Sequence, residues 1–186
     1  PASRGVLFLV IFTQMAKELT FPISDLLRKP MGTKEEFFID IKPDLGDDFT
    51  LKSSIKGRVV FMAMHDEIHV EVHDLETSIS GNCGKCLKKY SQKIEIPLIE
   101  REFFPAIPKI LGDQEDVFLI NKKDMTVDLS EVLRQEILLH FPLIPVCSKS
   151  CKGLCPKCGI DLNKKTCECK KETTADKPLA ILKQFK

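Results

Sequence analysis

The cysteines are the residues whose type and spacing point most directly to chemistry in this sequence. All eight fall in clusters: Cys83 and Cys86 form one Cys-x2-Cys pair, and the other six lie within residues 147–169. A Cys-x2-Cys turn presents two thiolates to one ion, and eight thiols complete two four-thiolate sites with none left over. The sequence therefore predicts a protein that binds two zinc ions.

The spacing also predicts how the thiols are shared between the two ions. One set is close enough in sequence to close a site locally, and we name it site two: Cys155, Cys158, Cys167 and Cys169. Elimination leaves four ligands for site one, which would tie the body of the protein to its tail: Cys83, Cys86, Cys147 and Cys151. An arrangement that holds all metal inside the tail remains open, and replacing Cys83 would distinguish the two.

Two other uses of cysteine fit the pattern less well. A disulfide framework is typical of small secreted chains, whereas 186 residues at 43% hydrophobic can bury a core unaided. A thioredoxin-like dithiol at Cys83-Gly84-Lys85-Cys86 would need a strand-to-helix junction, and here the pair lies between two alternating strands.

The segments that must position the cysteines are mostly strands. Alternating apolar residues predict strands at 37–41, 51–61, 68–72, 75–82 and 92–100, with shorter candidates at 117–120 and 125–127. Cys83 and Cys86 then occupy a hairpin tip. A short helix is expected at 23–27, ended by Pro30, and a last one at 178–185.

A single longer helix precedes the second cysteine cluster. Asp128-x-x-Glu131 predicts a capping box that opens this helix near 129–141, and Pro142 ends it. Its expected buried stripe is Leu129, Val132, Leu133 and Ile137. The fold class is therefore α+β: an antiparallel β-sheet or partly closed barrel with one main helix and a C-terminal cysteine-rich zinc module.

Three divisions of the chain are expected. Residues 15–146 form the β body, and residues 147–186 form the zinc-binding module with the short terminal helix. Residues 1–14, an apolar run behind Arg4, are expected to lie upstream of the native start and outside the fold, or alternatively to belong to a presequence.

The sequence offers no motif for catalysis. It contains no Walker loop, no G-x-S-x-G elbow and no G-x-G-x-x-G. His65-Asp-Glu-Ile-His69 places its Glu one position late for a zincin motif, and on a strand residues four apart are about 13 Å apart. We expect a protein that is not an enzyme, has no small-molecule substrate and has no membrane partner, since no run of eighteen apolar residues occurs.

Charge points instead to a polyanion. The formal net charge is only +1, yet residues 147–186 carry ten lysines against Asp161, Glu168, Glu172 and Asp176. A basic face of this kind suits RNA phosphate. The candidate phosphate contacts flank the cysteines: Lys85, Lys88, Lys89, Lys152, Lys157, Lys164 and Lys165.

Several motifs together resemble one family. They are Cys83-Gly-Lys-Cys86-Leu, Glu136-Ile-Leu-Leu-His-Phe-Pro, Pro145-Val-Cys147 through Cys158-Gly159, and Asp161-Leu-Asn163. This pattern resembles the bacterial YceD family, the large ribosomal RNA subunit accumulation proteins, in the version with a full C-terminal cysteine cluster. In looser form the resemblance covers most of residues 15–186. Asp176-Lys-Pro-Leu-Ala differs from the Asp-Pro-Arg-Leu-Ala common in the family.

The resemblance implies a noncatalytic ribosome-biogenesis factor that supports accumulation of large-subunit (23S) rRNA. Its partner would be that rRNA or a pre-ribosomal particle, with a ribosomal protein as a further partner. It implies a cytoplasmic location, or a plastid one if residues 1–14 belong to a presequence. The alternatives are a zinc-stabilised adaptor that docks on a ribosomal protein or assembly factor, and a thiol redox or zinc sensor.

Overall fold

The computed structural model describes residues 14–16, 18–107 and 117–169. The chain divides into two compact units. The β unit comprises Pro1–Gly81 and Tyr90–Leu143, and the cysteine unit comprises Asn82–Lys89 and Ile144–Lys186. That residues 15–146 and 147–186 are separate domains stays a prediction. The upstream segment 1–13 and the terminal helix expected at 178–185 lie outside the described residues.

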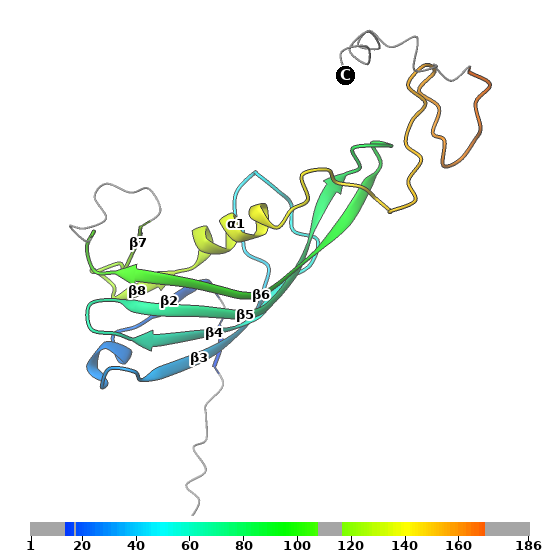
Figure 1. Ribbon diagram of the computed structural model, residues 1–186. Coiled ribbons are helices and arrows are strands. Elements are labelled where there is room, and N and C mark those ends of the chain that lie inside the picture. Colours follow the sequence, from blue (N-terminus) through cyan, green and yellow to red (C-terminus); the bar gives the residue numbers. More distant parts are fainter. Residues whose placement is uncertain (1–13, 17, 108–116, 170–186) are drawn as a thin grey trace, which may run out of the picture. The chain divides into compact units, whose positions relative to one another are not determined.

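The main sheet is open and has the strand order β1-β3-β4-β5-β6-β7 (Figure 1). Its strands are β1 (Gln14–Ala16), β3 (Lys34–Ile41), β4 (Ile55–Ala63), β5 (Ile68–Asn82), β6 (Lys89–Phe104) and β7 (Phe118–Leu119). β4 pairs antiparallel with both β3 and β5, whereas β1 on β3 and β7 on β6 are parallel. The α+β class is confirmed, and the described strands form an open sheet rather than a partly closed barrel.

Alternation along the strands builds the core of the β unit. On β4 the residues Val59 and Phe61 are buried, and each lies opposite a buried residue of β5 in the register Val59↔Val72 and Phe61↔Val70. Phe61 also packs against Phe21 and Phe37, with ring centroids 5.0 and 5.6 Å away. Aromatic pairs at such separations add to the stabilisation that their burial provides.

A smaller pair of strands connects the start of the fold to its helix. β2 (Thr20–Pro22) pairs antiparallel with β8 (Thr126–Asp128), and α1 (Ser130–Leu139) follows directly. Figure 1 shows α1 over one face of the main sheet. The predicted stripe is buried in the core, with exposures of 0% or 1%: Leu129, Val132, Leu133 and Ile137.

The predicted capping box is wrong in register. Asp128 still belongs to β8, the N-cap position falls on Leu129, and no side-chain cap hydrogen bond forms there. Asp128 Oδ1 instead accepts a hydrogen bond from the Ser130 amide at 2.8 Å, and Glu131 pairs with Arg134. The β2–β8 ladder therefore delays the start of the helix by one residue.

Two other elements are shorter than predicted. The expected helix at 23–27 is a single 3-10 turn, η1 (Leu26–Arg28), because the Ile23 amide bonds to the Met125 carbonyl at 2.9 Å and continues the pairing of β2 with β8. The strand expected from Leu51 begins at Ile55, and Leu51 makes only an isolated bridge to Ile79. None of the helices in the described residues has the length and apolar character needed to cross a membrane.

Candidate metal centres

A tight turn at the tip of the β5–β6 hairpin presents the first cysteine pair. The Leu87 amide donates to the Cys83 carbonyl at 2.8 Å, and the Cys83 amide donates to the Lys88 carbonyl at 2.9 Å. Leu87 has a φ of 61°, in the left-handed region. The Gly84 amide donates to the Pro145 carbonyl at 2.7 Å, which brings the segment before Cys147 to this tip.

The four cysteines expected in site one lie together. Their Sγ atoms are all within 4.8 Å of one another: Cys83, Cys86, Cys147 and Cys151. The Sγ atoms of Cys83 and Cys151 are 3.8 Å apart, and those of Cys86 and Cys147 are 3.7 Å apart. A tetrahedron with metal–sulfur bonds of about 2.3 Å has an edge of about 3.8 Å. The spacing fits four thiolates around one ion, and all four cysteines are free.

The second cysteine pair occupies the same kind of turn. The Gly159 amide donates to the Cys155 carbonyl at 2.9 Å, and the Cys155 amide donates to the Ile160 carbonyl at 2.8 Å. Gly159 has a φ of 71°, at the position that Leu87 holds in the first turn. The Sγ atoms expected in site two also lie within 4.8 Å of one another: Cys155, Cys158, Cys167 and Cys169.

Each site combines an easily ionised thiol with one that resists ionisation. The backbone N–H of Cys147, followed by those of Cys86 and Lys85, lowers the pKa of Cys83 to about 6. The N–H groups of Cys158 and Lys157 likewise lower the pKa of Cys155 to about 6. Backbone donors aimed at sulfur favour the thiolate.

The opposing thiols resist ionisation when no cation is bound. Contact with the Cys86 thiol, together with burial, raises the pKa of Cys147 to about 12. Contact with Cys158, together with burial, raises the pKa of Cys169 to about 12. Four thiolates crowded together repel one another, and a divalent ion offsets much of that repulsion. Both groups of four cysteines are therefore able to hold a metal ion.

The predicted phosphate contacts all lie in the cysteine unit, and all are exposed: Lys85, Lys88, Lys89, Lys152, Lys157, Lys164 and Lys165. Lys88 comes from the hairpin tip and Lys164 from the loop of site two. Both lysines act electrostatically on Asp161, whose pKa is lowered mainly by hydrogen bonds from Asn163 and further by the charges of Lys164 and Lys88. Lysines from the two segments therefore act on the same carboxylate.

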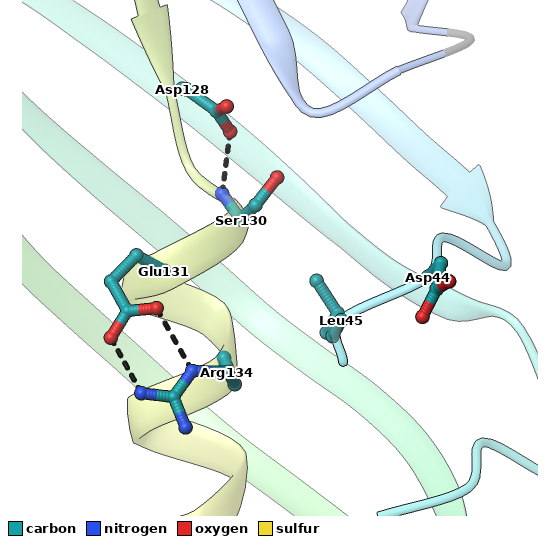
Figure 2. A pocket seen from close by; sticks show the side chains of 6 residues that line it. All are labelled: Asp44, Leu45, Asp128, Ser130, Glu131 and Arg134. Atoms are coloured by element: carbon teal, nitrogen blue, oxygen red, sulfur yellow. Dashed lines mark hydrogen bonds and ion pairs between the residues drawn. The ribbon is translucent and has the colours of Figure 1, made fainter. Parts of the chain in front are cut away.

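The histidines and the described pocket belong to the β unit. His69 and His73 lie beside Glu71, and His140 Nδ1 lies 2.9 Å from the Glu136 carbonyl oxygen. The pocket lies between the start of α1 and the loop before β4 (Figure 2), lined by Asp44, Leu45, Asp128, Ser130, Glu131 and Arg134. Glu131 and Asp48 both bind the Arg134 guanidinium, so these charges stabilise the helix start and its neighbouring loop.

Two residues of the cysteine unit gain a role that sequence reasoning did not assign. Asn163 donates from Nδ2 to Cys151 Sγ at 3.5 Å, and Gly153 lies against the Lys85 carbonyl. The Asp161-x-Asn163 spacing is typical of an Asx turn, and the Asn163 amide does bond to Asp161 Oδ1 at 3.0 Å. That signal predicts the turn but not the contact with sulfur.

Comparisons with known proteins match part of the chain. An uncharacterized protein of Mycobacterium tuberculosis is 32% identical over 82 residues, which are 44% of this chain and 39% of that protein. A protein of Arabidopsis thaliana named large ribosomal RNA subunit accumulation protein YCED homolog 1, chloroplastic, is 35% identical over 60 residues, 32% of this chain and 19% of its own length. The protein of the same name in Zea mays is 39% identical over 59 residues, which are 31% of this chain and 20% of that protein. No solved structure matches.

The alignments therefore span well under half the length of these relatives. A sequence model of one family covers more of the chain. Described as large ribosomal RNA subunit accumulation protein YceD, it matches residues 73–186, from within β5 through both cysteine groups. The hairpin tip, the two sets of four thiols and the lysines around them all fall inside this match, and the chain belongs to the YceD family.

Proposed function

We propose that this chain is a noncatalytic ribosome-biogenesis factor that supports accumulation of large-subunit (23S) rRNA by binding the rRNA or a pre-ribosomal particle. The observation that carries the proposal is the family match over residues 73–186, because it includes both cysteine groups and all seven candidate lysines. We place its action in the cytoplasm, or in a plastid if residues 1–14 belong to a presequence.

We propose zinc as the metal of both sites. Four thiolates in a tetrahedral arrangement suit Zn²⁺, which has no redox chemistry of its own and serves structurally when protein ligands fill all four positions. Cys83, Cys86, Cys147 and Cys151 would hold one ion, and Cys155, Cys158, Cys167 and Cys169 the other. Each loaded site would fix its loop and the lysines carried on it.

Preorganised lysines are the proposed means of binding RNA. The described part of the cysteine unit carries Asp161 and Glu168 as its acidic residues, against eight lysines: Lys85, Lys88, Lys89, Lys149, Lys152, Lys157, Lys164 and Lys165. Each zinc with four thiolates retains a charge of about −2, so the lysines remain in excess. Contacts to phosphate release counterions, which makes the affinity fall as salt rises.

The test is ultraviolet crosslinking in cells, followed by sequencing of the attached RNA. We compare the parent with a triple variant, Lys88→Glu, Lys152→Glu and Lys164→Glu. A matched control makes the same charge change on exposed lysines of the β unit: Lys52→Glu, Lys122→Glu and Lys123→Glu. Crosslinks concentrated on large-subunit rRNA, lost in the first variant and kept in the second, are expected. Scattered crosslinks in the parent would refute direct binding.

A salt titration of the purified protein on a crosslinked rRNA fragment measures the same contacts. Each phosphate contact contributes about 0.7 to 0.9 to the slope of log affinity against log salt. Loss of three contacts should therefore reduce the slope by about 2 to 3. An unchanged slope in the Lys88, Lys152 and Lys164 variant would exclude these lysines as phosphate contacts.

A second candidate function is an adaptor that binds a basic ribosomal protein or assembly factor. The observation that favours it is the surplus of acidic residues on the β unit, including the sheet-face pair Glu100 and Glu102 beside His69. Association with pre-ribosomal particles that survives RNase treatment would favour the adaptor over direct rRNA binding.

A further inference from the structure

We infer that sites one and two bind metal cooperatively, and that Asn163 is the positioning residue that couples them. The inference rests on the metal binding proposed above and adds a dependence of each site on the other. It arises from contacts that run between the two sites within the cysteine unit.

Asn163 belongs to the loop of site two and contacts a ligand of site one. Its Nδ2 donates to Cys151 Sγ at 3.5 Å and to Asp161 Oδ1 at 2.8 Å. Its Oδ1 accepts a hydrogen bond from the Lys152 amide at 2.8 Å. Because Oδ1 is engaged by an N–H donor, the amide orientation is fixed and the NH₂ group faces the sulfur. The side chain thus donates to a thiol that site one requires as thiolate.

The backbone forms a second connection at the same junction. The Leu154 amide donates to the carbonyl of Lys85, inside the first Cys-x2-Cys turn, at 2.9 Å. The Leu162 amide, in the loop of site two, donates to the Gly153 carbonyl at 2.9 Å. Residues 152–154 are therefore held on one side by the turn of site one and on the other by the loop of site two.

Gly153 makes this close approach possible. Its φ is +76°, and a Cβ placed there would lie 2.9 Å from the Lys85 carbonyl oxygen. An alanine would be strained by its backbone conformation and would also push the two segments apart. Gly159 offers a matched position, since its φ is +71° and a Cβ placed there would have no neighbour within 4 Å.

Chain connectivity sets the order of loading. The ligands of site two all lie within residues 155–169, whereas site one joins thiols that are 61 and 68 residues apart. Closing a longer loop costs more entropy, so site two fills first. A filled site two fixes the Asp161–Asn163 turn, which then presents its N–H to Cys151 and its oxygen to Lys152. Groups that hydrogen-bond to metal ligands typically change metal affinity about 10- to 100-fold.

A double-mutant cycle on the full chain tests the inference. Co²⁺ is titrated into the reduced, metal-free protein without oxygen, and the thiolate-to-cobalt absorption reports each ion bound. Because site two fills first, site one is the second ion bound in the chains that keep site two and the single ion bound in the chains that lack it. The four chains are the parent, Asn163→Ala, a variant without site two (Cys158→Ala with Cys167→Ala), and their combination. We expect loss of site two to weaken site one about tenfold in the parent and to have little further effect once Asn163 is alanine.

The other outcomes distinguish failure of the coupling from failure of metal binding itself. Equal affinity of site one with and without site two would overturn the coupling, and an equal loss in both backgrounds would overturn the role of Asn163. Binding of fewer than two cobalt ions by the parent would overturn both the proposed metal sites and the coupling.

Control variants test the contacts themselves. Thr166 is exposed on the loop of site two, and Thr166→Ala should leave the affinities of both sites unchanged. Gly153→Ala should reduce the coupling, whereas Gly159→Ala should retain it.

Discussion

The two Cys-x2-Cys turns of the cysteine unit share one backbone design but close their sites differently. In both turns the residue after the second cysteine has positive φ and bonds back to the carbonyl of the first cysteine. The other two thiols that lie beside the turn at Cys155 belong to the same loop and are Cys167 and Cys169. The other two thiols that lie beside the turn at Cys83 are 61 and 68 residues further along. The same local chemistry therefore makes a self-contained loop in one place and a long-range crosslink in the other.

The largest expected difference follows from loss of one ligand in each site. Cys83→Ser should remove one of two bound zinc ions and release residues 144–151 from the hairpin tip. Cys158→Ser should also remove one ion, but with zinc in excess site one stays filled and only the loop at 155–169 loosens. A crosslink across a longer loop restricts the unfolded chain more, so the first variant should lose more stability.

Zinc content by elemental analysis and limited proteolysis measure this difference. Cleavage between residues 140 and 150 should accelerate in the Cys83 variant and not in the Cys158 variant. Equal zinc content in the Cys83 variant and the parent would refute the assignment of Cys83 to site one, and would favour an arrangement with all metal inside the tail.

The thiols of the metal-free protein should ionise in the same order in both sites. With a pKa of about 6, Cys83 and Cys155 are thiolates at pH 7.5 to 8. Cys147 and Cys169, with a pKa of about 12, remain protonated there. Cys83 is 0% exposed and Cys155 6% exposed, which shields both sulfurs from alkylating reagents, so their ionisation is measured from the ultraviolet absorption of the thiolates.

The pH dependence of this ionisation follows from the same values. The ordinary thiol pKa is 9.0, so thiolate formation at Cys83 and Cys155 stabilises the metal-free fold fully above pH 9. That contribution falls as the pH drops from 9 and is lost below 6. The absorption of both thiolates should fall in step through pH 6. Absence of thiolate absorption at pH 7 would contradict the described hydrogen bonds.

The smallest expected effect comes from the residue with positive φ in each turn. Leu87 adopts a φ of 61° that glycine tolerates better, and its side chain is 66% exposed. Leu87→Gly should therefore cost little packing and stabilise the zinc-loaded protein by up to about 1 kcal/mol. Gly159→Ala should destabilise it by about 1 kcal/mol through the reverse change. Denaturant midpoints at fixed zinc concentration measure both, and shifts of the same sign would contradict the equivalence of the two turns.

Local pattern predicted much of the β unit. Alternation of apolar residues gave the strand around Phe37 and Ile39 and the hairpin that carries Cys83. Helical periodicity gave the buried stripe of α1, including Val132 and Ile137. These features depend on side chains near one another in sequence, and their burial follows from the period of the strand or helix. The capping box at Asp128 was wrong because the pairing of β8 with β2, a contact far along the chain, holds Asp128 in a strand.

The sequence by itself determined the chemistry available to this protein: eight thiols in pairs, the lysines beside them and the turns that present them. Elimination along the sequence grouped Cys83 and Cys86 with Cys147 and Cys151, but only tertiary structure decided between this grouping and one inside the tail. Cys83 and Cys151 approach to 3.8 Å only when the hairpin tip and the segment after Pro145 fold together. Tertiary structure also decided that Asn163 reaches the sulfur of Cys151 across the junction of two sites. Spacing restricts neighbours along the chain, whereas contacts between distant segments depend on how the backbone packs.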